Sequence, residues 1–451
     1  MDYAQSTKEA GTLDPTFGDN GMVLLPLPGI SGYIPSAFHA SPDKKLLIAL
    51  RANVSEKVPA KVVRVNENGT IDTTFGIEGA ANVPLEDDLW LVPSALYPAQ
   101  SGGWIITGTA IRATEEGEDN PDLAVIKLKD DGQLDDAFGT RGRLIITIAD
   151  LGLEAASGVK FKPRRDAEKA SDDAMVAGTI GGADIRLQDD KIVLVSTVFF
   201  GFDNLRGLVL RLHSNGKFDT SFNKTGFVFI EVPDHPAATN YAHGVKVQPD
   251  LKVLVCGNVF RSEGEYPDAY LMRYNRDGTV DTTFGAAKNG VVIISDSKKW
   301  LELYSIALKP DGGVVAAGHS AMDKALIIAL DANGSFNLAF NQGQPLFSGF
   351  LRNLSWFRSI LQQDGKIITV GVSNSAQFPT NAATVTARFD AHGKLDETFA
   401  GQGWTLIDKE LSHAIYRDSA LMPDERLVVC GFFMGAASGY VARYLGGESV
   451  R

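Results

Sequence analysis

Aromatic and basic residues that stand just before a set of short apolar segments are the side chains best suited to hold a ligand. The segments begin at comparable positions, namely Ser36, Ser94, Gly244, Ser305, Ser359 and Ser419. The candidate ligand-binding residues precede or flank these positions and are Tyr33, Trp90, Tyr241, His243, Trp300, Trp356, Arg358, Tyr416 and Arg417. Rings give a large contact area at little cost in side-chain entropy. With arginine neighbours they suit a sugar, a peptide or an aromatic ligand.

The same rings also have a structural interpretation. A residue type that recurs at one place in repeated segments often fills one repeated packing position, so the rings could instead wedge between neighbouring sheets. Solvent exposure separates the two interpretations.

Sequence signatures of catalysis, metal binding and cofactor binding do not occur in the chain. Its seven histidines are scattered, without an H-E-x-x-H motif or the cysteine and histidine spacing typical of zinc sites. There is no G-x-S-x-G nucleophile elbow and no glycine loop that would hold a phosphate. Turns such as NENGTID resemble the opening of an EF-hand loop but lack its bidentate glutamate and flanking helices. We therefore assign no catalytic residue, no metal ligand and no cofactor.

A phrase related to NRDGTVDTTFG, at 275–285, occurs seven times along the chain. Its phenylalanine stands at Phe17, Phe75, Phe138, Phe222, Phe284, Phe340 and Phe399. Six residues before each phenylalanine is a glycine, and three residues before it is an aspartate, replaced once by Asn337. The chain is therefore built from repeated units of roughly 60 residues.

Between the motifs, each unit contains four short apolar runs. The unit after Asp281 reads GVVIISD, YSIALKPDG, GVVAAGHS and KALIIALDANG, with Gly, Asp or Pro at the boundaries. Such runs are typical of buried strands and too short for helices. One small four-stranded sheet cannot bury both of its faces, so seven of them indicate radial repetition around an axis. We predict an all-β fold, a seven-bladed β-propeller of four-stranded blades, with a β-solenoid as the alternative.

The two ends of the chain complement each other. The chain starts with a motif and the run GMVLLPL, and it ends in SGYVARYLGGE without a further motif. We predict that residues 21–27 form the outer strand of the last blade, whose other strands lie near 417–445, which closes the ring and removes a sheet edge. The propeller then spans 12–451 as one domain, preceded by an N-terminal tail at 1–11. The motif turns lie near 13–21, 71–79, 134–142, 218–226, 280–290, 336–343 and 395–403.

Each motif residue has a predicted role in the turn between the third strand and the outer strand. The glycine permits a positive φ, the aspartate can accept hydrogen bonds from amides of its own turn, and the phenylalanine can fill the gap between blades. The motifs LDPTFGDNG, IDTTFGIEG, LDDAFGTRG, VDTTFG and LDETFAGQG resemble the delta-60 repeat of bacterial β-propeller proteins. The resemblance covers nearly the whole chain and implies the propeller, without a common activity or catalytic residues. The segment FNLAFNQGQ at 336–344 departs from the pattern because it lacks the aspartate.

Composition excludes several classes of partner. A formal charge of -12 argues against binding to nucleic acid or to an anionic membrane surface. No apolar run reaches the roughly 18 residues of a membrane helix, and MDYAQSTKEAG lacks the features of a signal peptide. We expect a soluble monomer in the cytoplasm by default, although leaderless export or a removed leader would leave the same sequence. Cys256 and Cys430 fall on blades far apart in the ring, so we expect both to be free and buried.

The third unit carries an insertion of roughly 20 residues at about 160–182. Its first part holds five basic residues against two acidic ones; the basic residues are Lys160, Lys162, Arg164, Arg165 and Lys169. A protrusion that binds a partner is one interpretation. The others are a solvated loop or a hairpin in which GVKFKP pairs with AMVAGTI.

The predicted propeller places the candidate binding residues at one mouth of its central channel. We therefore predict a non-catalytic binding or interaction scaffold that uses this face to bind a protein, peptide or glycan ligand. The alternative is a propeller enzyme, a hydrolase or lyase with or without a metal, because residues from different blades can meet in the channel without a linear signature. A purely structural module is the third class.

Overall fold

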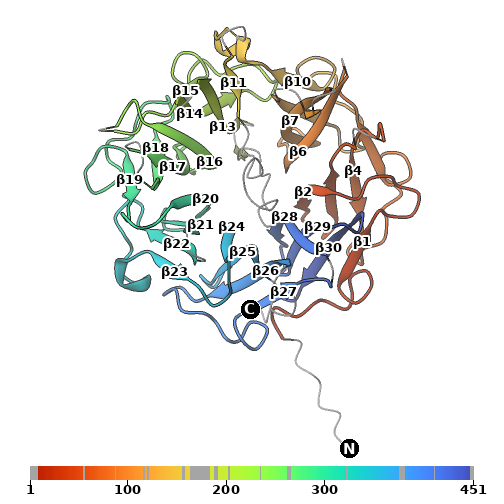
Figure 1. The fold of residues 1–451 in the computed structure, drawn as a ribbon. Helices are drawn as coiled ribbons and strands as arrows, with labels where there is room; N and C mark the ends of the chain where they lie inside the picture. Colours follow the sequence, from red (N-terminus) through yellow and green to blue (C-terminus); the bar gives the residue numbers. More distant parts are fainter. Residues whose placement is uncertain are drawn as a thin grey trace, which may run out of the picture.

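Seven antiparallel sheets stand around a common axis as the blades of a propeller (Figure 1), which confirms the predicted fold class. The computed structural model describes residues 9–446 except 54–55, 87, 115–116, 119–120, 155–157, 163–182, 187–190, 202–203, 234, 262–265, 321–323, 375–380 and 411.

The strands follow one order in every blade, from the axis outward. Blade 1 contains β2 (Pro35–Ala40), β3 (Leu46–Leu50), β4 (Ala60–Val65) and β5 (Ala80–Val83). Blade 2 contains β6 (Leu89–Pro98), β7 (Trp104–Thr114), β9 (Asp122–Leu128) and β10 (Arg143–Ile146), with β8 (Gly117–Glu118) paired to β7. Blade 3 contains β11 (Lys160–Phe161) and β12 (Ala183–Arg186), then β13 (Lys191–Gly201), β14 (Asn204–Leu212) and β15 (Phe227–Phe229). Blade 4 contains β16 (Thr239–Val247), β17 (Val253–Phe260), β18 (Asp268–Tyr274) and β19 (Val291–Ile294). Blade 5 contains β20 (Leu301–Leu308), β21 (Val314–Ser320), β22 (Lys324–Leu330) and β23 (Leu346–Ser348). Blade 6 contains β24 (Ser355–Leu361), β25 (Ile367–Asn374), β26 (Ala382–Phe389) and β27 (Trp404–Ile407). Blade 7 contains β28 (His413–Leu421), β29 (Leu427–Met434), β30 (Ser438–Tyr444) and β1 (Met22–Leu25).

Two short 3-10 segments, η1 (Ile148–Leu151) and η4 (Asn341–Gly343), lie in connections between strands. Across the residues that the structure describes, no helix combines the length and apolar character required to cross a membrane.

The ring closes through strand β1, as the sequence predicts. β1 pairs antiparallel with β30, with Met22 opposite Ala442 and Leu25 opposite Gly439. Figure 1 shows this first strand beside the last strands of the chain. The outer edge of β30 is thereby paired, so the ring has no unpaired seam at this blade.

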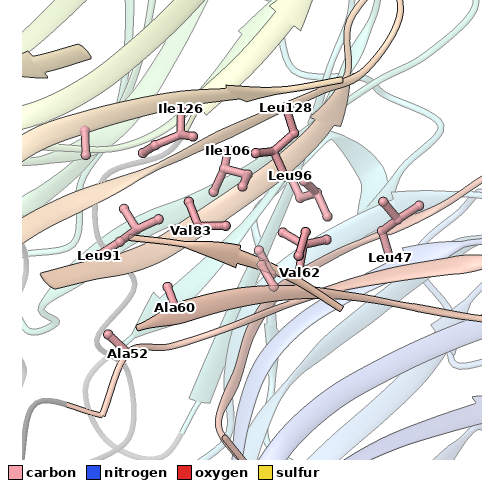
Figure 2. Close-up of a cluster of buried hydrophobic side chains, with 14 of the residues drawn as sticks. Leu47, Ala52, Ala60, Val62, Val83, Leu91, Leu96, Ile106, Ile126 and Leu128 are labelled. Carbon is pink, nitrogen blue, oxygen red and sulfur yellow. The ribbon is translucent and has the colours of Figure 1, made fainter. Parts of the chain in front are cut away.

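The core of the protein is distributed over the interfaces between blades. At the interface of blades 1 and 2, Leu47 and Val62 pack against Ile106 and Ile126, and all four side chains have no exposed surface (Figure 2). The second strands are apolar on both faces because each blade has a neighbour on either side, and every residue of β3 is buried. Seven such clusters hold the ring together.

The motif turns link each blade to the next through the backbone. In blade 1, Asp72 accepts hydrogen bonds from the N–H and hydroxyl of Thr74, at 3.1 and 2.7 Å, and Phe75 is completely buried. The N–H after the phenylalanine donates to the carbonyl that precedes the glycine of the next motif. These donor and acceptor pairs are Gly18 and Asn68, Gly76 and Asp131, Gly139 and Asn215, Asn223 and Asp277, Gly285 and Asn333, Asn341 and His392, and Ala400 and Ala10, with N···O distances of 2.6–3.2 Å. The bond from Ala400 to Ala10 completes the circle.

The motif glycine is required by this contact. Gly132 has a φ of +89°, and a Cβ there would lie 3.0 Å from the ring of Phe75 in the preceding blade. Both the backbone conformation and the close approach of the phenyl ring therefore exclude a side chain.

An arginine on the third strand joins the motif aspartate, its phenylalanine and the next blade. Arg273 donates from Nε to Asp281 at 2.7 Å and from Nη1 to the carbonyl of Ala332 at 2.6 Å, and its guanidinium lies 4.4 Å from the centroid of Phe284. We call this set of contacts the interblade latch. Equivalent pairs are Arg64–Asp72, Arg211–Asp219, Arg388–Asp396 and Arg443–Asp14, with Lys127–Asp135 in blade 2.

The carboxylates of the latch are held in their charged form. Burial alone would raise the pKa of Asp281, but hydrogen bonds from Thr283 and Lys252 and the charge of Arg273 outweigh it and hold that pKa well below its usual range.

Blade 5 lacks both charged partners of the latch. Ala329 occupies the position of the arginine, and Asn337 occupies that of the aspartate. The N–H of Asn337 still donates to the carbonyl of Ala329, so the backbone geometry is kept. The missing acid noted in the sequence is thus matched by a missing base, which avoids a buried charge without a partner.

The insertion of the third unit interrupts an innermost strand. Both β11 and β12 pair with β13, so the chain leaves the strand after Phe161 and re-enters it at Ala183. In the predicted pairing of GVKFKP with AMVAGTI, the second segment, 174–180, lies outside the described residues, while Lys160 and Phe161 of the first pair with β13. Cys256 and Cys430 are both free and buried, as expected.

Candidate binding pocket on the propeller axis

The innermost strands of six blades carry a β-bulge at the same place. The register of each with its neighbour shifts around one extra residue, and these extra residues are Ser36, Ser94, His243, Tyr304, Phe357 and Arg417. A bulged residue is not paired in the ladder, and the bulge changes the direction of its side chain. Because the innermost strands border the axis (Figure 1), the bulges determine what faces the channel.

Five of the six bulged residues line one cavity of about 90 Å³. The cavity is bordered by strands of blades 2, 4, 5, 6 and 7. Besides the bulged residues, its charged and aromatic lining consists of Tyr97, Lys246, Arg358, Tyr416 and Asp418. We call this cavity the axial pocket.

Four aromatic rings form a continuous arc along one side of the axial pocket. His243 meets Tyr304 edge-on, with ring centroids 5.3 Å apart. Tyr304 stacks on Phe357 at 5.2 Å and 21°, and Phe357 stacks on Tyr416 at 6.2 Å and 12°. Each contact crosses from one blade to the next, so the arc is built by four blades together. We call it the aromatic arc.

Basic side chains outnumber acidic ones in the axial pocket. Lys246, Arg358 and Arg417 line it together with one carboxylate, Asp418. Arg358 lies 3.6 Å from Asp418, which also accepts the N–H groups of Phe38 and Ser419. The pocket is therefore cationic within a protein of formal charge -12.

Burial is the main cause of the pKa shifts of Tyr416, Arg417 and Asp418 in the pocket. Burial raises the pKa of Asp418, and the charge of Arg358 opposes this effect. Burial lowers the pKa of Arg417 to about 10, and the positive charge of Arg51 adds to the decrease. Burial and the charge of Arg51 destabilise the charged form of Arg417. A bound anion would stabilise that charged form.

Buried polar groups fix the orientation of the pocket rings. His243 Nε2 lies 2.8 Å from Asn258 Oδ1, and the hydroxyl of Tyr416 lies 2.9 Å from Ser419 Oγ. Glu302 accepts a hydrogen bond from the hydroxyl of Tyr304. The arc is thus held in place before any ligand arrives.

The structure brings four of the nine predicted residues together. His243, Arg358, Tyr416 and Arg417 line the axial pocket. Outside it, Tyr241 stacks on His243 with centroids 5.9 Å apart.

The remaining four predicted residues lie elsewhere. Trp356 is completely buried in the cluster between blades 5 and 6, so the expectation that it stands at an open mouth is wrong. Tyr33 and Trp90 are partly buried against the clusters that flank blade 1. For these three residues the packing interpretation describes the observed surroundings. Trp300 is 37% exposed and stands at the start of β20.

The residues predicted from the sequence do not include Tyr97, Lys246, Tyr304, Phe357 or Asp418. A bulge shifts the alternation of side chains by one residue, and the spacing of the apolar segments does not show where that shift falls. A signal was present on the neighbouring strand, where a glycine faces the residue before the bulge. These glycines are Gly108, Gly257, Gly318, Gly371 and Gly431. A Cβ at any of them would lie within 1.8–2.2 Å of a carbonyl oxygen of the innermost strand, so no other residue fits there.

The described residues lack the sets of ligand side chains that metal ions require. Groups of three or more His, Cys, Asp or Glu residues able to hold a metal ion do not occur among these residues.

Comparison with known proteins supports a β-propeller family. Four segments, residues 41–75, 187–222, 248–284 and 362–399, match the family described as "Domain of unknown function (DUF5122) beta-propeller". Each segment ends at a motif phenylalanine. A search among curated proteins found no match.

Three solved structures illustrate what this chain is similar to. The polysaccharide lyase Uly1 is 9% identical with a TM-score of 0.50, and the match covers 99% of this chain and 94% of that one. Sqt1 from Chaetomium thermophilum is 11% identical with a TM-score of 0.45, covering 92% and 97%. The alpha-L-arabinanase of Penicillium chrysogenum is 10% identical with a TM-score of 0.43, covering 85% and 98%. At these identities the likeness concerns the fold alone.

Proposed function

We propose that the protein is a non-catalytic binding scaffold whose axial pocket receives an anionic group attached to a ring or other flat apolar face. The observation that carries this proposal is the presence of the aromatic arc and three basic side chains on one cavity. The ligand class remains that predicted from the sequence, a protein, peptide or glycan, now with a negative charge at the contact.

The two halves of the pocket have complementary roles. The stacked rings of Tyr304, Phe357 and Tyr416 offer a flat apolar wall that stays ordered without ligand. Arg358 and Arg417 supply hydrogen-bond donors in a planar arrangement that matches a carboxylate or a similar oxyanion. A concave site concentrates the field of these charges and attracts an anion despite the negative charge of the whole protein.

The proposal is tested by comparing the binding of ligands that differ mainly in whether they carry a negative charge. Glucuronate and glucose differ mainly by a carboxylate, and calorimetric titration measures both. We expect the acid to bind and the neutral sugar to bind at least tenfold more weakly, which corresponds to roughly 1.4 kcal/mol. Arg417→Gln and Arg358→Gln should each weaken binding of the acid. Arg141→Gln should leave that binding unchanged, because Arg141 is 77% exposed on an outer turn.

Two results would contradict the proposal. One is equal affinity for the acid and the neutral sugar. The other is acid binding that survives both pocket substitutions, since the contact would then lie elsewhere. A panel of acidic peptides and benzoate, titrated in the same way, separates the peptide and aromatic classes from the glycan class.

A propeller enzyme is the second candidate, and one observation favours it. His243 and Tyr304 touch within the axial pocket, and both residue types can transfer protons. Beside Arg358, which can neutralise a carboxylate, they would suit a lyase acting next to an acid group. Incubation with uronate polymers, followed by absorbance and reducing-end assays, distinguishes this candidate. If the protein degrades such a polymer and His243→Ala abolishes this activity, the enzyme hypothesis would replace the scaffold hypothesis.

Finer assignments from the sequence belong to the same proposal. We propose that the repeats are of the bacterial delta-60 type, that the protein is a monomer in the cytoplasm, and that it binds neither nucleic acid nor membrane. The negative formal charge supports the last two exclusions.

A further inference from the structure

We infer that the ligand of the axial pocket also contacts a second aromatic site centred on Trp300, and that this ligand is an acidic oligosaccharide chain. This inference rests on the proposed function and extends it from a single anionic group to a chain of sugar rings. We call the second site the Trp300 platform, formed by Trp300, Phe260 and Tyr266.

The Trp300 platform presents an exposed ring with rigid support. Trp300 is 37% exposed and packs edge-on against Phe260, with centroids 5.4 Å apart and planes at 85°. Tyr266 is 52% exposed in the loop between β17 and β18. The next residue, Pro267, is tied to β20, because its carbonyl accepts a hydrogen bond from the N–H of Leu301 at 3.0 Å. Exposed aromatic rings held in one orientation are what the apolar face of a sugar stacks on.

A single buried carboxylate couples the Trp300 platform to the axial pocket. Glu302 accepts a hydrogen bond from Trp300 Nε1 at 2.6 Å through one oxygen, and from the hydroxyl of Tyr304 through the other. The side chain of Tyr304 belongs to the aromatic arc, so the exposed indole and the arc are positioned by the same group. One ligand chain can therefore contact both without rearrangement of either.

Basic side chains lie near the rings at both sites. Lys298 is exposed two residues before Trp300, and Arg261 is paired with Asp268. The axial pocket adds Arg358 and Arg417. Rings with basic groups beside them suit a polymer that repeats a flat sugar face and an acid.

A peptide strand fits this surface less well. Peptides that bind to sheet edges need a regular row of free backbone groups. The innermost strands are interrupted by bulges in six of the seven blades, which disrupt such a row. We therefore expect the ligand to be recognised through aromatic rings and charged side chains, not through backbone hydrogen bonds.

Chain-length dependence of binding tests the inference. The probes are galacturonate and its linear oligomers of two to four residues, with neutral galactose oligomers for comparison, titrated by calorimetry. We expect the longest acidic oligomer to bind at least tenfold more tightly than galacturonate. Trp300→Ala should remove that gain, by about tenfold, and weaken the longest acidic oligomer more than galacturonate. Trp300→Phe should keep part of the gain because a ring remains.

Matched variants separate the possible failures. Ile77→Ala removes a large side chain that is 80% exposed on an outer turn, and it should change neither affinity. Arg417→Gln should weaken every acidic probe. If Trp300→Ala leaves the length dependence intact, the Trp300 platform is not a subsite, while the proposed function stands. If neither galacturonate nor its oligomers bind, the inference fails, while benzoate and the acidic peptides still test the proposed function. If neutral oligomers bind as well as acidic ones, the acidic glycan class is wrong.

Discussion

The interblade latch makes a quantitative prediction that blade 5 itself suggests. Asp281 has a side chain that is 4% exposed and accepts from Arg273, Lys252 and both donors of Thr283. Asp281→Asn keeps one oxygen for Thr283 but leaves the guanidinium of Arg273, 7% exposed, without its carboxylate. Breaking a buried ion pair from one side costs about 3–5 kcal/mol. We expect a loss of stability in that range.

The second half of the prediction concerns the double variant. Arg273→Ala with Asp281→Asn copies the natural combination of Ala329 and Asn337. The double variant should be less destabilised than the sum of the two single variants, by about 1–3 kcal/mol, because it leaves no buried charge unpaired.

Urea unfolding followed by tryptophan fluorescence measures all four proteins of this cycle. The slopes of the transitions should agree, so that midpoints report stability alone. Additive losses, with a coupling below about 0.5 kcal/mol, would show that the two charges do not act as a unit. That result would refute the explanation given for the departure at blade 5.

Three further predictions concern the ring as a whole. The pKa of Asp14 is lowered from 3.8 to about 2, so the stability that its charge provides should be complete above about pH 4 and lost as the pH falls toward 2; urea midpoints that stay flat across this interval would contradict the latch. Cys256 and Cys430 have no exposed surface and burial raises the pKa of both thiols, so Ellman's reagent should label neither until the protein is unfolded. Deletion of residues 1–27 removes β1 and exposes the edge of β30; the truncated chain should aggregate on size-exclusion chromatography, and a peptide of residues 9–27 should restore a monomeric peak.

The repeated part of the architecture was accessible from the sequence because it uses the same residues in every unit. The registers of Phe75 and its equivalents fixed the number of blades, and the unmatched first motif fixed the closing strand. These features depend on local rules of turn geometry and strand length, which a single unit displays fully. The motif also predicts the aspartate of the turn, whereas its arginine lies 8 residues earlier on the preceding strand, outside the motif.

The pocket was only partly accessible because its geometry depends on pairing between strands. The types of His243, Arg358, Tyr416 and Arg417 predicted them, whereas Tyr304 and Phe357 lie one and two positions before the aligned Ser305 and Ser359. Inserting one residue into a strand reverses the face of every side chain beyond it. Trp356 stands directly before the bulge of its strand and packs into the cluster between blades 5 and 6, which neither composition nor spacing displays.

The motif turns use the same residue types in nearly every blade, whereas the bulges near the axis use different ones. Where the fold requires a side chain, the units agree, as the buried phenylalanines of the motif show. At the bulges the backbone is equally regular, yet the side chains are Ser36, Ser94, His243, Tyr304, Phe357 and Arg417. A role imposed by blade packing would select one residue type at all six positions, so packing does not explain this variety. The rings gather on consecutive blades, 4 to 7, and the basic groups adjoin them, which makes the two sides of the channel unlike. Ligand recognition requires side chains that differ between blades while the backbone repeats. The bulged residues near the axis meet this requirement.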